Sequence, residues 1–190
     1  MFMYEKIIAV TDRKLCSRPF AEQILRVCQR RPAALVLREK DLSETEYRSL
    51  AQEVLGICRE YHVKCILHNF PETALELGVK RIHLPLFKLS SLPGQMKAEF
   101  SEIGTSVHSH GEAREAARNG ASYLFAGHIY DSQCKPGLAP RGLPFLKEIC
   151  GTVNMPVYAI GGIRPEEAQI REVLDCGAAG ACIMSGMMRL

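Results

Sequence analysis

Short apolar runs recur along the whole chain, and a segment with helical spacing of apolar side chains follows most of them. The runs predict β-strands at residues 6–10, 34–37, 64–67, 81–84, 103–107, 123–126, 157–160 and 180–183. The clearest helical stripe follows Ser43 and runs from Tyr47 to Tyr61. Regular alternation of strand and helix predicts a parallel sheet with right-handed crossovers.

The number of strand–helix units sets the expected fold. About eight units predict a compact single (β/α)8 TIM barrel over residues 1–190, with no further domain. Ser43 with Glu46, and Ser109 with Glu112, have the spacing of capping boxes at helix starts. The least regular segment is 85–100, where a helix is only weakly indicated. An open flavodoxin-like sheet is the alternative, but its five strands would leave three runs unexplained.

Composition narrows the class of protein. The chain has 190 residues and a formal net charge of +3, without a long basic run, which gives no indication of a nucleic-acid partner. No apolar run approaches the roughly 18 residues of a membrane span, and the amino terminus resembles a first strand more than a signal peptide. The eight cysteines form no C-x-x-C pair, which indicates reduced thiols and a cytoplasmic protein.

Polar residues and glycines follow the predicted strands, where a barrel carries its active site. Gly161 and Gly162 follow the seventh strand, and Met184, Ser185 and Gly186 follow the eighth. Backbone N–H groups in such loops bind phosphate, so these loops predict a phosphate site. The alternative is that the glycines only make tight turns.

Other strand ends supply charge and hydroxyl groups. Arg38 and Lys40 follow the second strand and could hold a second anionic group, although a solvated charge cluster is an equal alternative. Ser106 belongs to the same ring of strand-end residues. Asp12 could bind a metal or form a salt bridge. No D-x-D or H-E-x-x-H motif is present, so no metal site is predicted.

His128 is the strongest candidate for acid–base chemistry. It follows the sixth strand and Gly127, with Lys135 in the same loop. An unperturbed histidine has a pKa of roughly 6.5, so one imidazole can both take and return a proton near neutral pH. His68 and His108 are the alternative bases. Cys134 lies nearby but has no evident partner for thiol catalysis.

These motifs together resemble the thiamine phosphate synthase superfamily. The resemblance covers residues 10–13, 37–40, 104–108, 127–135, 159–163 and 183–185, in order over nearly the whole chain. It implies a (β/α)8 barrel that binds a thiazole phosphate at the loops after strands seven and eight.

Two branches of that superfamily differ in their metal site. The synthase branch joins a pyrimidine diphosphate to the thiazole phosphate with magnesium, and typically has Asn-Asp after the third strand and Asp after the fourth. Here Asn69 precedes Phe70, and residues 83–87, which include Leu86, contain no acid. The synthase also typically has Thr-x-Thr at 132–134 and Gly-Pro at 127–128, where this chain has Ser-Gln-Cys and Gly-His.

These departures resemble the TenI-type thiazole tautomerases. The expected protein is therefore a metal-independent isomerase without a cofactor, which aromatises a thiazole carboxylate phosphate by proton transfer through His128. The resemblance places Ser132, Cys134 and Lys135 near the thiazole substrate. The alternatives are a thiamine phosphate synthase and a non-catalytic, phosphate-binding regulatory barrel. The sequence leaves a homo-oligomer open and indicates no partner except the small-molecule substrate.

Overall fold

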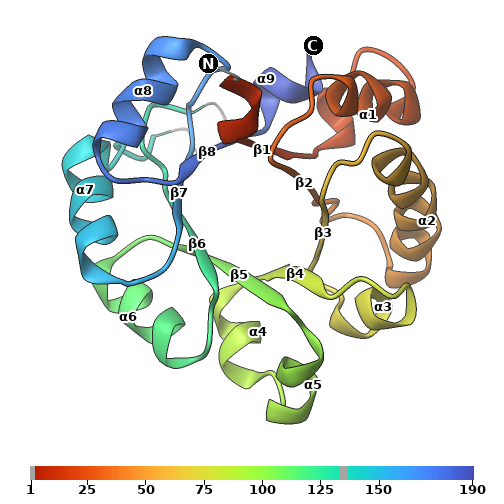
Figure 1. Ribbon diagram of the computed structural model, residues 1–190, viewed down its shortest axis with the longest axis horizontal. Coiled ribbons are helices and arrows are strands. Elements are labelled where there is room, and N and C mark those ends of the chain that lie inside the picture. Colours follow the sequence, from red (N-terminus) through yellow and green to blue (C-terminus); the bar gives the residue numbers. More distant parts are fainter. Residues whose placement is uncertain (1–2, 133–136) are drawn as a thin grey trace.

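Eight parallel strands close into a barrel in the computed structural model, which describes residues 3–132 and 137–190 (Figure 1). Each strand pairs with the next along the chain, and the eighth pairs with the first. The strands are β1 (Ile7–Val10), β2 (Ala34–Leu37), β3 (Cys65–His68), β4 (Arg81–Leu84), β5 (Glu102–Val107), β6 (Tyr123–Gly127), β7 (Val157–Ile160) and β8 (Gly180–Ile183). The predicted (β/α)8 barrel is confirmed.

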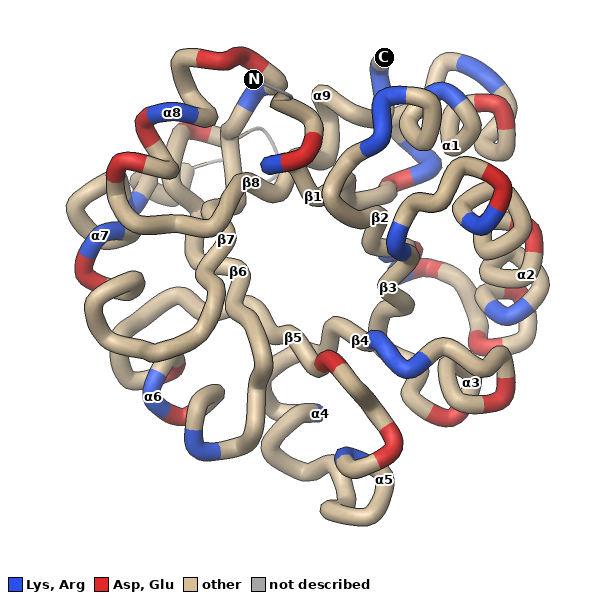
Figure 2. Tube along the Cα trace, viewed as in Figure 1, with Lys and Arg blue, Asp and Glu red and all other residues tan. Residues whose placement is uncertain are grey.

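Helices surround the barrel as an outer ring (Figure 1). They are α1 (Phe20–Gln29), α2 (Glu44–Glu60), α3 (Pro71–Glu76), α4 (Leu86–Ser91), α5 (Gly94–Glu99), α6 (His110–Arg118), α7 (Gly142–Thr152), α8 (Glu167–Asp175) and α9 (Ser185–Met188), with 3-10 turns η1 (Met3–Lys6) and η2 (Arg13–Leu15). Acidic and basic positions gather on this ring (Figure 2). In the described parts of the chain, no helix combines the length and apolar character needed to span a bilayer.

The irregular segment 85–100 contains two short helices instead of one. Leu92 ends α4 in an extended conformation, with φ −66° and ψ 127°, and Pro93 precedes α5. A residue before proline is pushed out of the helical region because the proline ring clashes with its backbone. The Leu92-Pro93 pair therefore divides the crossover between β4 and β5.

The two predicted capping boxes differ. Ser43 and Glu46 form a complete box at the start of α2, with both reciprocal bonds present. At α6, the Ser109 hydroxyl accepts the Glu112 N–H at 3.1 Å, but the Glu112 carboxylate accepts the N–H of His108. The second box is therefore only half formed, and Glu112 fixes the residue after β5.

Alternation along the strands separates two apolar layers. Ile8, Val10 and Val36 belong to the cluster inside the barrel, whereas their neighbours Ala9 and Leu37 belong to the larger core between strands and helices. Successive strand residues point to opposite faces of a sheet, so inward positions recur at every second residue. The same alternation, continued past the strand ends, decides which polar residues face the mouth of the barrel.

Gly104 makes room for an aromatic side chain inside the barrel. A Cβ atom at this position would lie 2.0 Å from the ring of Tyr123, on the neighbouring strand β6. Tyr123 is 5% exposed, and its hydroxyl lies 3.3 Å from Nδ1 of His83. Tyr123 therefore fills the space beside Gly104 and connects the middle of the barrel to a histidine nearer the mouth.

Tyr47 on α2 forms hydrogen bonds to the carboxyl ends of both β2 and β3. Its buried hydroxyl donates to the Leu37 carbonyl at 2.7 Å and accepts the His68 N–H at 2.8 Å. Burial raises the pKa of this phenol, so it stays protonated. The two strand ends that carry Arg38 and His68 are held by one side chain.

Candidate active site

A cavity of about 460 Å³ opens at the carboxyl ends of the strands. Most of the residues predicted from the sequence line it, namely Arg38, Lys40, Ser106, His128, Ser132, Gly162, Met184 and Ser185. Gly186 lies outside the cavity wall, beside Pro165. Cys134 and Lys135 lie outside the described residues. The structure also places His68, His108, Glu112 and Phe125 in the wall.

His83, inside β4, forms part of the cavity floor. Its Nε2 lies 3.0 Å from the Ser106 hydroxyl, and its ring stacks on Phe125 with centroids 4.2 Å apart. Burial lowers the pKa of His83 well below its ordinary value, so the ring is neutral. The floor therefore offers an aromatic surface with one hydroxyl held in place.

His68 lies next to His83, with ring centroids 6.1 Å apart. Burial, together with the positive charges of Arg38, Lys40 and Lys88, lowers its pKa to about 3. His68 is 7% exposed and stays neutral at neutral pH. Its ring therefore lies among cations without adding to their charge.

Stability should fall in mild acid because of His68. The unfolded chain binds a proton near pH 6.5, whereas folded His68 binds one only near pH 3. The free energy of unfolding is therefore highest above pH 6.5 and falls as the pH drops. At pH 5 this group alone should cost about 2 kcal/mol. Urea unfolding of the parent and of His68→Gln at pH 7 and pH 5 measures it. An equal pH dependence in both would exclude His68 as the source.

His128 is buried in the wall, with 7% exposed. Its Nε2 lies 3.2 Å from the Leu138 carbonyl, and because a carbonyl only accepts, Nε2 is the donor. On the other side of Gly127, Nδ1 of His108 donates to the Gly127 carbonyl at 2.7 Å. The two histidines therefore hold the loop that follows β6.

Gly161 and Gly162 let two loops pack closely. Both have positive φ, 99° and 71°, which favours glycine. A Cβ on Gly161 would lie 2.2 Å from Cβ of His128, and one on Gly162 would lie 2.3 Å from the Asp131 carbonyl oxygen. These glycines thus have a packing role beside any role in binding an anion.

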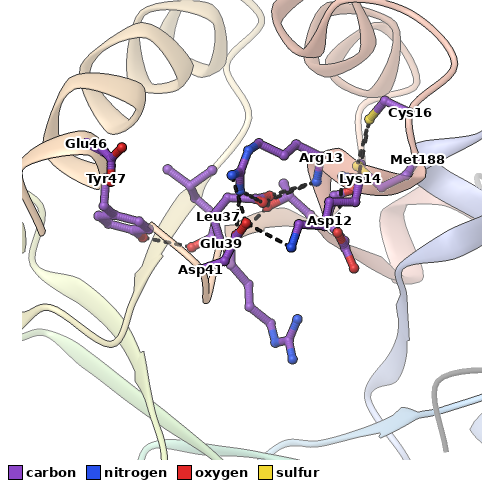
Figure 3. A network of polar contacts seen from close by, with 12 residues as sticks. Asp12, Arg13, Lys14, Cys16, Leu37, Glu39, Asp41, Glu46, Tyr47 and Met188 are labelled. Carbon is purple, nitrogen blue, oxygen red and sulfur yellow. Dashed lines mark hydrogen bonds and ion pairs between the residues drawn. The ribbon is translucent and has the colours of Figure 1, made fainter. Parts of the chain in front are cut away.

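Acidic side chains at the β1–β2 edge are bound to basic ones (Figure 3). Glu39 is 3% exposed and accepts bonds from the Thr11 hydroxyl at 2.7 Å and from the Arg13 guanidinium at 3.0 Å. Arg13 and Lys14 both pair with Asp41, at 2.6 and 2.9 Å, and hold the pKa of that carboxyl well below its usual range. Because Glu39 alternates with Arg38 and Lys40, its side chain points away from the cavity, which the other two line.

The carboxylates do not fit a magnesium ion. Asp12 caps η2, with Oδ1 accepting the Lys14 N–H at 3.2 Å. Glu112 is the single acid among the described residues that line the cavity, and it binds the His108 N–H. Across residues 3–132 and 137–190, no group of three or more His, Cys, Asp or Glu side chains could hold a metal. Magnesium bound to phosphates needs at least one or two carboxylates.

Comparisons with known proteins agree on one family. Residues 7–187 match the family model described as thiamine monophosphate synthase. The thiamine-phosphate synthase of Clostridium acetobutylicum is 34% identical over 96% of this chain and 87% of its own. A putative thiamine-phosphate synthase 2 of Aquifex aeolicus is 32% identical, over 87% of this chain and 89% of its own. A solved thiamine phosphate pyrophosphorylase from Pyrococcus furiosus superposes with a TM-score of 0.81 at 27% identity, over 98% of this chain and 89% of that one.

These relatives overturn the expected thiazole tautomerase. Both curated relatives and the solved structure carry names of synthases or pyrophosphorylases, so the isomerase assignment is wrong and the synthase alternative is favoured. The tautomerase expectation depended on a few positions just after strand ends, including Phe70 and His128 in loops and Leu86 at the first residue of α4. The segments between strands and helices vary more in sequence among homologues than the strands and helices do. These few positions are therefore weaker evidence for the activity than the similarity over the whole chain.

Proposed function

Because the chain belongs to the thiamine monophosphate synthase family, we propose that it is a transferase that joins a pyrimidine diphosphate to a thiazole phosphate in thiamine biosynthesis. One observation carries the proposal: the cavity has two separate regions suited to anions. Arg38 and Lys40 lie at the β2 side, and Gly161, Gly162 and Ser185 lie at the β7–β8 side. An isomerase with one phosphate ester needs one phosphate site, whereas a condensation of two phosphorylated substrates needs two.

The thiazole phosphate is assigned to the β7–β8 side. Backbone N–H groups of Gly162, Met184 and Ser185 would hold it, and the Ser185 hydroxyl adds a donor. Gly186 would contribute through its tight packing beside Pro165, which fixes the loop. This assignment keeps the predicted phosphate residues and leaves Arg38 and Lys40 for the second anion.

The two rings would lie between these ends, over the floor of His83 and Phe125. The reaction forms a bond from the thiazole nitrogen to the carbon that carries the diphosphate, while the carbon–oxygen bond to the diphosphate breaks. Negative charge then develops on the leaving diphosphate, and fixed cations at that place lower the barrier. The attacking nitrogen has a free electron pair, so no base is required, and His128 and Ser132 serve to position the thiazole.

Free thiols support the expected cytoplasmic setting. The cysteines among the described residues form no disulfide, and the Cys28 and Cys58 thiols share a hydrogen bond at 3.9 Å. Thiols at such a distance persist in a reducing compartment, where the soluble precursors of a cofactor are made.

The test is formation of thiamine phosphate from the two purified substrates. Product is oxidised to its fluorescent thiochrome and measured with and without added magnesium, against protein-free and heat-denatured controls. We expect product that accumulates in proportion to protein concentration. Binding of both substrates without any product above the controls would contradict the transferase and favour the non-catalytic barrel.

A further inference from the structure

We call the β2 side of the cavity, with Arg38 and Lys40, the diphosphate end. Cations surround it, and the nearby acids are bound to other basic residues. Glu39 and Asp41 are bound to Arg13 and Lys14 on the outer side of the β1–β2 edge. Within the described residues, no carboxylate lies within ion-pair distance of Arg38. A second anion that reaches this region therefore meets positive charge without a competing carboxylate.

The side chain of Lys88 reaches the loop after β3, where the synthases typically have an acid. Lys88 belongs to α4, after β4, but its Nζ donates to the Asn69 carbonyl at 3.1 Å, in the loop after β3. The same ammonium lies 5.8 Å from the centre of the Phe70 ring, which supports a cation–π contact. Asn69 and Phe70 stand where the synthases typically have Asn-Asp, so the ammonium occupies the surroundings of the missing carboxylate.

The position of Lys88 suits a ligand that brings negative charge. An ammonium has three N–H donors, and the Asn69 carbonyl takes one of them. Lys88 is half-buried, which weakens screening by water and strengthens an ion pair. Its charge also reaches His68, together with those of Arg38 and Lys40, and lowers the pKa of that imidazole. All three cations therefore act on one residue of the cavity lining, His68, and Lys88 directly follows Phe87, which also lines the cavity.

From this arrangement we infer that the diphosphate end binds its anion without magnesium, with Lys88 standing in place of the ion. The inference rests on the proposed function, because it specifies how the second substrate of that reaction is held. Magnesium offsets negative charge through coordination by carboxylates and phosphates. A fixed ammonium offsets it directly and needs no acid beside it, so a site of this kind can carry Phe70 and Leu86 where the synthases typically have acids.

The test uses inorganic pyrophosphate as the probe and titration calorimetry of the whole protein in EDTA. We expect binding in EDTA that excess magnesium does not tighten. Lys88→Met should weaken binding by about tenfold or more, the usual range for a lost charged hydrogen bond. The matched control is Lys97→Met, since half-buried Lys97 also donates to a backbone carbonyl, that of Asn119 at 3.1 Å, but is not among the charges that lower the pKa of His68. Its affinity should equal that of the parent.

Two results would overturn the inference. One is binding that requires magnesium, and the other is an equal loss of affinity in Lys88→Met and Lys97→Met. The coupling reaction is measured separately from pyrophosphate binding. A failure of the metal-free site can therefore be told apart from a failure of the proposed transferase function. Thiamine phosphate formed only with magnesium would leave the proposed function standing and refute the metal-free site. Pyrophosphate bound in EDTA through Lys88, with no coupled product, would refute the function and leave the site standing.

Discussion

Replacing Gly104 with alanine is expected to lower the free energy of unfolding by about 3 kcal/mol, the upper part of the range for overpacked cores. The added Cβ would lie 2.0 Å from the Tyr123 ring, far inside contact distance. The ring cannot withdraw easily, because it also contacts Phe125 and Tyr158 and its hydroxyl lies 3.3 Å from His83. The barrel interior must therefore distort to accept one methyl group.

Urea unfolding followed by circular dichroism measures this effect. The control is Gly56→Ala in α2, where a Cβ would meet nothing within 4 Å, so alanine should stabilise that helix by about 0.5–1 kcal/mol. Tyr123→Leu should rescue Gly104→Ala, with the double variant more stable than the sum of the single effects. Additive effects would show that the clash with Tyr123 is not the cause.

Replacing Arg38 with methionine is expected to lower kcat/KM of the coupling reaction by about 100-fold, since a fixed cation at a developing charge is typically worth 10²–10³. The half-buried guanidinium lines the cavity at the diphosphate end. The backbone of Arg38 is held separately, because its N–H donates to the Thr11 hydroxyl at 2.9 Å. Loss of the side chain should therefore leave the strand end in place.

Steady-state kinetics of Arg38→Met and of a control, Arg81→Met, test this prediction. Arg81 is also half-buried, but it lies at the amino end of β4, where its Nε donates to the Cys65 carbonyl at 3.2 Å. The control should keep the parent kcat/KM. If Arg38→Met unfolds like the parent and keeps full activity, the diphosphate end is misplaced. Thiazole phosphate binding should be unchanged in both variants.

Strand positions could be predicted from the sequence because seven of the eight apolar runs are followed by a glycine, proline or polar residue; the exception, 180–183, is followed by Met184. β2, β4, β7 and β8 have the predicted limits, β1, β5 and β6 differ by one residue at one end, and β3 differs by one residue at both ends. Local composition specifies these elements, since a buried parallel strand is apolar on both faces. The division of segment 85–100 was not predicted, because two short helices and one irregular helix give similar apolar spacing.

Sequence reasoning missed two residues, His83 in the cavity and Lys88 beside it, for different reasons. His83 could have been found, because alternation from Arg81 along β4 places it on the inward face with its neighbours on other strands. Lys88 could not, since its contact with Asn69 depends on how α4, which follows β4, packs beside the loop after β3. Sequence patterns predict strands and helices well, but contacts between segments that follow different strands depend on how the barrel closes.

Opposite charges next to each other on one strand end give the pocket a further property. Arg38 and Lys40 line the cavity, and Glu39 between them lies against Thr11 and Arg13. An insertion of a single residue within β2 would move the residues after it to the opposite face of the sheet. Glu39 would then point inward, and Arg38 and Lys40 outward. The binding preference would then change from anions to cations without any substitution. Relatives with a strand of altered length here would differ in ligand charge even where these three residues are kept.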